Sequence, residues 1–292
     1  MTAALAPVAN AMSFTDIFVL GDSLSDTGNV FAVLGTPADP YFDGNFSNGP
    51  VWIEIIAAAL NLPVNPNFQG GTNYAIGGAQ TSTAGLLPGS GLTSQGTNLI
   101  SFSGGTLPSD ALYAIWGGGN DVLNSTSLTG PGNLSQEGAD NIAAIVTNLA
   151  AAGATTFLIP NLPDIGATPA AGSNSALFSQ LTDEFNTELA QVIADLQANL
   201  GVTIITLDVF SILDAFLSNP MGLNTTDPCF VDAGNVCADP DNYVFWDDVH
   251  PTAFAHAVLG NTALASLVPV PAAVWLFGSA LIGLFGLRRR PA

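Results

Sequence analysis

Asp247 and His250 are the first candidates for chemistry, because a histidine follows a carboxylate by three positions in a chain with only two histidines. A neutral imidazole can accept a proton from a serine hydroxyl, and an adjacent aspartate can orient the ring and stabilise the imidazolium that forms. Asp248 stands beside Asp247, so the spacing alone leaves open which carboxylate faces the ring. A simpler alternative is that these residues cap the helix that Pro251 begins.

A serine that fits such a base lies near the start of the chain. Ser23 follows the apolar run Ile17 to Leu20, in a turn rich in glycine and aspartate. Open α/β sheets place reactive groups at the carboxyl ends of their strands, which makes Ser23 the candidate nucleophile. Taken alone, a Gly-Asp-Ser segment is more often only a turn.

Two clusters of glycine and asparagine follow, at residues 70–79 and 117–121. Glycine lets backbone N–H groups approach a ligand closely, and the amide of an asparagine side chain is a neutral donor. Both clusters therefore suit an oxyanion hole, although each is also a common type of loop.

Together these segments resemble the SGNH/GDSL hydrolases, whose four sequence blocks occur here in the family's order. The blocks lie at residues 21–24, 71, 118–121 and 247–250. The resemblance implies that Ser23 is the nucleophile, His250 the base and Asp247 the residue that orients the base. It also implies an oxyanion hole made by the backbone N–H groups of Ser23 and Gly71 and by the side chain of Asn120.

The second histidine, His256, is expected to be a packed structural residue. It lies within the helix predicted for residues 252–267, and no carboxylate is paired with it in sequence. No metal or organic cofactor is implied, since the nucleophile, the base and the oxyanion donors are all amino acids.

Cys229 and Cys237 are the only cysteines of the chain. No second cysteine pair or histidine lies at metal-ligand spacing from them, so a metal site is a weak interpretation. We predict a disulfide that closes the short loop between them, and this bond implies an oxidising compartment.

Apolar runs alternate with helical stretches, which predicts a mostly parallel central sheet with helices on both faces, a three-layer α/β/α sandwich. The resemblance to SGNH hydrolases implies that this sandwich is flavodoxin-like. Strands are expected at 17–20, 111–116, 155–160 and 202–208, and helices at 51–60, 135–152, 176–200 and 252–267. Residues 81–108 lack strong periodicity, so we expect a long loop that walls or covers the substrate site.

The charge of the chain is lopsided, because 23 acidic residues face only three arginines, at 288–290, and no lysine. Phosphate contacts need lysine or arginine, so nucleic acid is excluded as a partner. No guanidinium is available to clamp an anionic group, which favours a neutral ester substrate such as a lipid or an acylated small molecule.

The carboxyl-terminal segment at residues 268–292 has a distinct pattern: Val268-Pro269-Val270-Pro271 precedes an apolar stretch at 272–287 and the three arginines. This segment resembles a PEP-CTERM sorting signal, with Val270 where the name-giving glutamate would stand. A helix of about 16 residues rises about 24 Å, so a transmembrane helix here would rely on snorkelling arginines or a thinned bilayer. The arginines would stay cytoplasmic and the preceding domain outside.

Three segments are therefore expected. Residues 1–11 are the remnant of a signal peptide, residues 12–267 one SGNH/GDSL hydrolase domain, and residues 268–292 a sorting and membrane-anchor segment that a sorting protease would recognise. The expected protein is an exported serine esterase or lipase of the bacterial cell envelope, or a secreted one. Two alternatives remain: an O-acetyl esterase acting on exopolysaccharide, and a surface-anchored binding or matrix protein with a vestigial hydrolase site.

Overall fold

Four parallel strands make the central sheet of the protein. The computed structural model describes residues 12–267. The strands are β1 (Ile17–Gly21), β2 (Leu112–Trp116), β3 (Thr156–Pro160) and β4 (Thr203–Leu207), and they are hydrogen-bonded in that order. All three pairings are parallel. Each strand lies within one residue of the bounds predicted from its apolar run.

An extended segment at residues 72–76 continues the sheet beyond β1. The N–H of Val19 donates to the carbonyl oxygen of Thr72 at 3.1 Å, and the N–H of Tyr74 donates to the carbonyl oxygen of Val19 at 2.8 Å. With this segment counted as the second strand, the order is the 2-1-3-4-5 of flavodoxin-like sheets. The strand order then reverses at β1, and ligands of such sheets bind beyond the carboxyl ends of the strands at that point.

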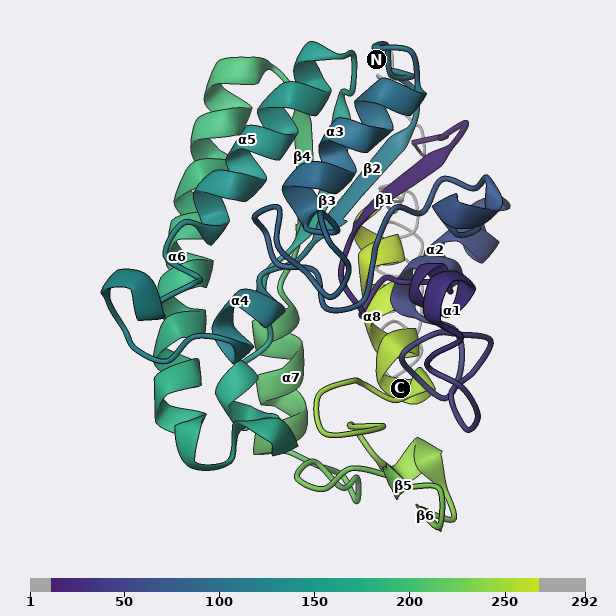
Figure 1. The fold of residues 1–292 in the computed structure, drawn as a ribbon, viewed down its shortest axis with the longest axis vertical. Helices are drawn as coiled ribbons and strands as arrows, with labels where there is room; N and C mark the ends of the chain where they lie inside the picture. Colours follow the sequence, from purple (N-terminus) through teal and green to yellow (C-terminus); the bar gives the residue numbers. More distant parts are fainter. Residues whose placement is uncertain (1–11, 268–292) are drawn as a thin grey trace, which may run out of the picture.

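Helices cover both faces of the sheet, which gives the expected three layers (Figure 1). The helices are α1 (Asn29–Leu34), α2 (Trp52–Leu60), α3 (Leu92–Phe102), α4 (Gly119–Leu123), α5 (Gly138–Ala151), α6 (Ser175–Leu200), α7 (Val209–Ser218) and α8 (Ala253–Leu267). Along β1, Phe18 and Leu20 pack into the apolar cluster under α3, α5 and α6, whereas Ile17 and Val19 pack into the cluster under α2 and α8. Side chains of a strand alternate between faces, so one apolar run serves both cores.

The prediction of one long loop at residues 81–108 was wrong, because this stretch contains α3. The buried stripe of α3 consists of Leu92, Gln95, Gly96 and Leu99. A glutamine and a glycine fill half of that stripe, which weakens the apolar periodicity on which the recognition of a helix depends. The other predicted helices are present, each within three residues of its expected bounds.

His256 is fully buried on α8, as expected of a packed residue. Its Nδ1 accepts a hydrogen bond from the backbone N–H of Trp52 at 3.2 Å, at the start of α2. Burial lowers the pKa of His256 to about 3, so the ring is neutral and serves as an acceptor for a helix N-terminus.

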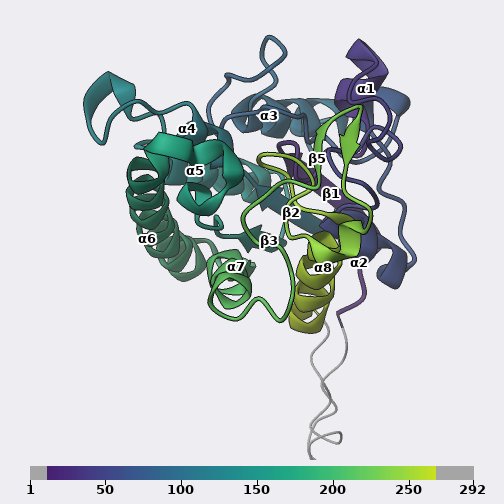
Figure 2. The same ribbon diagram turned by 90° about the horizontal axis from the view of Figure 1, so that it is seen from below.

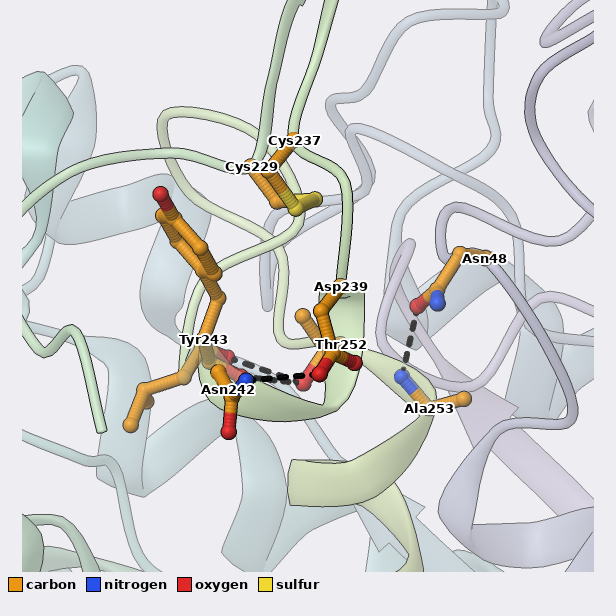
Figure 3. Close-up of a disulfide and its surroundings, with 9 residues drawn as sticks. Asn48, Cys229, Cys237, Asp239, Asn242, Tyr243, Thr252 and Ala253 are labelled. Atoms are coloured by element: carbon orange, nitrogen blue, oxygen red, sulfur yellow. Dashed lines mark hydrogen bonds between the residues drawn. A yellow bond between two sulfur atoms is a disulfide. The ribbon is translucent and has the colours of Figure 1, made fainter. Parts of the chain in front are cut away.

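The disulfide predicted between Cys229 and Cys237 is present (Figure 3). It closes a hairpin of two short antiparallel strands, β5 (Phe230–Asp232) and β6 (Asn235–Val236). The N–H of Phe230 donates to the carbonyl oxygen of Trp246 at 2.6 Å. The hairpin therefore lies along the residues that immediately precede Asp247, and Figures 1 and 2 both place it at one end of the sheet.

The signal-peptide remnant predicted at residues 1–11 and the transmembrane helix predicted within 268–292 lie outside the described residues. No helix within residues 12–267 combines the length and the apolar character needed to cross a membrane.

Candidate active site

Ser23, His250 and Asp247 form a continuous hydrogen-bonded row just beyond the carboxyl end of β1. The Nε2 atom of His250 lies 2.9 Å from Oγ of Ser23, and its Nδ1 atom lies 2.7 Å from Oδ2 of Asp247. Ser23 comes from the turn after β1, and the other two residues come from the loop that leads into α8. The fold thus brings together three residues that are separated by up to 227 positions in sequence.

Of the two adjacent carboxylates, Asp247 is the one that faces the ring. Its Oδ1 atom accepts hydrogen bonds from the backbone N–H groups of Val249 at 2.9 Å and His250 at 2.8 Å. Asp248 is exposed, and its backbone carbonyl accepts a hydrogen bond from Ala170. Burial would raise the pKa of Asp247, but the adjacent His250 and these hydrogen bonds outweigh it and lower the pKa to about 2.

Gly71, which the family resemblance assigned to the oxyanion hole, lies elsewhere. Its N–H already donates to the carbonyl oxygen of Pro66 at 3.0 Å, and it does not line the cavity beside Ser23. A Cβ atom at position 71 would collide with the carbonyl group of Asn65, so the glycine serves a tight turn. The assignment of Gly71 is therefore corrected.

Gly78, seven residues later in the same glycine cluster, does line the cavity beside Ser23. The N–H of its neighbour Gly77 donates to the carboxylate of Asp26 at 2.9 Å. Among residues 12–267, no acceptor is found for the backbone N–H of Gly78 or of Ser23. The geometry therefore leaves these two amides free for a ligand.

Asn120 completes the set of donors around the cavity. Its side-chain amide donates one hydrogen bond to the carbonyl oxygen of Ala79 at 3.0 Å, which ties Asn120 to the loop that carries Gly78. The amide has a second hydrogen, and Asn120 lines the cavity. The next residue, Asp121, fixes the same loop by accepting hydrogen bonds from the N–H of Thr81 at 3.0 Å and from its hydroxyl at 2.7 Å.

The cavity beside Ser23 has a volume of about 260 Å³. A second cavity, of about 60 Å³, adjoins it and lies against α7 and α8. Leu24, Ile165, Thr168 and Val249 belong to the walls of both cavities. The other side chains around the second cavity are all apolar: Trp116, Pro163, Val209, Ile212, Leu213, Phe216, Val244, Phe245, Pro251, Ala255 and Leu259.

The loop between α1 and α2 contributes residues that the sequence analysis missed. The hydroxyl of Tyr41 donates a hydrogen bond to Oδ2 of Asp247 at 2.7 Å. The ring of Phe46 lies 5.1 Å from the ring of His250, centroid to centroid, and Phe46 lines the cavity. No spacing pattern connects a single tyrosine to a carboxylate 206 residues further along the chain, so only the fold reveals the contact.

A serine, an imidazole and a carboxylate in such a row are typical of serine hydrolases. The fold is similar to that of an acetylxylan esterase from Geobacillus stearothermophilus, with a TM-score of 0.53 at 14% sequence identity over 88% of this chain and 96% of that one. It is also similar to LAE5, an alpha/beta hydrolase enzyme from the metagenome of Lake Arreo, with a TM-score of 0.52 at 16% identity over 88% and 97% of the two chains.

The GDSL-like lipase/acylhydrolase family matches residues 17–263, and the chain belongs to that family. The family is described as one of lipases and acylhydrolases. It is 28% identical to the thermolabile hemolysin of Vibrio parahaemolyticus, over 86% of this chain and 63% of that protein. It is 31% identical to Lipase 1 of Photorhabdus luminescens, over 56% of this chain. The matches span less than two thirds of these two relatives, 63% of the first and 25% of the second.

Proposed function

We propose that the protein hydrolyses neutral carboxylic esters by acyl transfer, with Ser23 as nucleophile and His250 as general base. The observation that carries this proposal is the 2.9 Å contact between Ser23 Oγ and His250 Nε2. The imidazole takes the serine proton as the hydroxyl attacks the ester carbonyl, and it returns a proton to the leaving alcohol. Asp247, ionised and bound to Nδ1, holds the tautomer in which Nε2 is free to accept that proton. Water then releases the acid from Ser23 by the same route.

The oxyanion of the tetrahedral intermediate would be bound by the backbone N–H groups of Ser23 and Gly78 and by the side-chain amide of Asn120. All three residues line one cavity, and the two backbone groups have no acceptor within residues 12–267. Preorganised donors of this kind stabilise the charge that develops in the transition state without reorganisation.

The substrate is proposed to be neutral and to carry an aliphatic acyl chain. Residues 1–287 contain no lysine or arginine, so no fixed cation is available to bind an anionic group. The apolar cavity against α7 and α8 adjoins the site of acylation through Leu24, which directly follows the nucleophile. Its volume of about 60 Å³ suits a short alkyl chain. Its apolar walls would stabilise such a chain by burying it, whereas the polar hydroxyl groups of a polysaccharide would find no hydrogen-bond partners there.

Labelling with a fluorophosphonate and hydrolysis of acetyl, butyryl and hexanoyl esters test the proposal on the full-length chain. The wild type should react with the probe, and Ser23→Ala should lose both labelling and turnover. Hydrolysis by Ser23→Ala at the wild-type rate would overturn the mechanism. Absence of labelling in the wild type would favour the vestigial binding protein, and activity confined to acetylated polysaccharide would favour the O-acetyl esterase.

A substitution in the apolar cavity tests the acyl site separately. Ala255 lines this cavity from α8, so Ala255→Leu should lower kcat/KM for the hexanoyl ester relative to the acetyl ester. Ala265→Leu is the matched control, because Ala265 is exposed on the same helix. If the ratio of kcat/KM for the hexanoyl ester to kcat/KM for the acetyl ester is the same in Ala255→Leu as in the wild type, the cavity is excluded as the acyl site. The assignment of Ser23 would not be affected.

A further inference from the structure

The carboxylate of Asp247 accepts four hydrogen bonds. Oδ1 accepts two from backbone N–H groups of its own loop, those of Val249 and His250. Oδ2 accepts two from side chains, the imidazole of His250 at 2.7 Å and the hydroxyl of Tyr41 at 2.7 Å. The same oxygen that orients the base is therefore shared with a tyrosine from a distant loop.

Tyr41 is an obligate donor in this contact. Burial, followed by the negative charge of Asp247, raises the pKa of Tyr41 well above its usual range, so the hydroxyl keeps its proton. Tyr41 does not line the cavity beside Ser23. Its hydroxyl therefore acts on the carboxylate and not on a substrate bound in that cavity.

An aromatic cluster fixes the position of the Tyr41 ring. The ring lies edge-on to Phe230 at 5.4 Å and to Trp246 at 6.0 Å, and the last two rings stack on each other at 5.5 Å. Phe230 belongs to β5 of the hairpin that the Cys229–Cys237 disulfide closes. The disulfide-closed hairpin thus supports the ring whose hydroxyl binds Asp247.

The same loop is anchored beyond the tyrosine as well. The hydroxyl of Ser47 donates to the carbonyl oxygen of Pro251 at 2.9 Å, and the N–H of Ala253 donates to the side chain of Asn48 at 2.8 Å. Figure 3 shows the second of these bonds in the surroundings of the disulfide. The loop at residues 41–48 is therefore hydrogen-bonded at both of its ends to residues 247–253, the segment that contains His250.

We propose that Tyr41 is a positioning residue that fixes the Asp247 carboxylate against His250, and that the disulfide-closed hairpin holds Tyr41 in place through Phe230. The inference rests on the proposed function, since it assigns a role within the same row of residues. The hydroxyl fills the last acceptor position of Oδ2 and prevents rotation of the carboxylate. It also takes up part of the negative charge that would otherwise stabilise a protonated His250.

Tyr41→Phe tests this role because it removes the hydroxyl and keeps the ring. We expect kcat to fall about tenfold with KM unchanged, since the variant loses an interaction that acts on the base and not on substrate binding. We also expect the acid limb of the kcat/KM profile to move up by about half a pH unit, because the full charge of Asp247 then favours protonated His250.

Tyr113→Phe is the matched control. The hydroxyl of Tyr113 also makes one hydrogen bond, to the carbonyl oxygen of Pro108 at 2.8 Å, but it lies away from the Ser23 cavity. This variant should lose stability without any movement of the acid limb. A Tyr41→Phe enzyme with wild-type kcat and an unmoved limb would overturn the proposal, and loss of Tm alone would assign Tyr41 a structural role. Ser23→Ala remains inactive in either case, so the proposed function is judged independently.

The hairpin is tested by reduction, which acts on one bond because the chain has only two cysteines. Reduction should lower kcat of the wild type and leave kcat of Tyr41→Phe nearly unchanged, since the variant has already lost the contact that the hairpin supports. An equal loss in both proteins, or no loss in the wild type, would overturn the link between the hairpin and Tyr41.

Discussion

The side-chain amide of Gln95 is bonded to both polar groups of Gly21. Its Oε1 atom accepts a hydrogen bond from the N–H of Gly21 at 2.8 Å, and its Nε2 atom donates to the carbonyl oxygen of Gly21 at 2.8 Å. Gly21 is the last residue of β1, and Ser23 follows two positions later. A fully buried glutamine on α3 therefore fixes the end of the strand that presents Ser23.

Gln95→Leu should destabilise the protein and lower activity together. The change leaves the buried N–H of Gly21 without its side-chain acceptor, at a cost of about 1 to 3 kcal/mol in the free energy of unfolding. The movement of β1 should also reduce kcat. Urea unfolding and ester kinetics measure both effects. Asn98→Leu is the control, since Asn98 is exposed on the same helix, and an equal effect of the two changes would contradict the role of Gln95.

Gln95 also explains why the sequence predicted the fold better than it predicted α3. The strands could be recognised from runs of apolar residues, as in Ile17–Gly21, which is buried at every position. In α3 the residue that matters most to the site is polar, and its neighbour Gly96 is small. A helix whose buried face includes hydrogen-bonded polar residues lacks the apolar periodicity from which helices are recognised in a sequence.

Asn120→Ala should reduce kcat by about 10² to 10³ with little change in KM, because one donor to the oxyanion is lost. Asn124→Ala removes an amide from an exposed position one turn later and is the control. Steady-state kinetics with a butyryl ester measures the difference. Equal kcat values for the two variants would show that the side chain of Asn120 does not contact the transition state.

The error at Gly71 and the omission of Tyr41 have a common cause. Gly71 and Gly78 belong to one cluster of glycines, and only the turn geometry decides which N–H is used within the protein and which stays free. Tyr41 and Asp247 lie on two different loops, 206 residues apart, and the spacing of residues in the sequence does not predict that these loops meet. Short-range patterns thus predicted that Ser23, Asp247 and His250 lie together, as they do in the structure, whereas the partners that depend on loop conformation could be found only in the structure.

Deletion of residues 268–292 should move the protein from the membrane fraction to the soluble fraction and leave kcat unchanged. The prediction rests on the sequence of that segment, with its apolar stretch and terminal arginines, and on a site whose described residues lie between Asp22 and His250. Fractionation and ester kinetics of both forms measure it. A truncated protein that aggregates or loses activity would indicate that the segment packs against the hydrolase domain.

The contributions of Asp22 and His256 to the free energy of unfolding change with pH in opposite directions. Burial raises the pKa of Asp22 to about 6, although the N–H of Leu24 and the nearby His250 act to lower it. Stability from protonated Asp22 is fully present below the unfolded pKa of about 4 and is lost as the pH rises through about 6. Burial lowers the pKa of His256 to about 3, so its contribution is present above about pH 6.5 and is lost as the pH falls towards 3.

Asp22→Asn isolates the first of these effects. The difference in unfolding free energy between the variant and the wild type should shift in favour of the variant by about 2 to 3 kcal/mol between pH 4 and pH 7, whatever its value at pH 4. Urea unfolding at pH 4, 5.5 and 7 measures it, with Asp183→Asn as the control because Asp183 is exposed on α6 and carries the same charge. A pH-independent difference for Asp22→Asn, or the same trend in the control, would show that burial of Asp22 does not govern the stability of the site in this range.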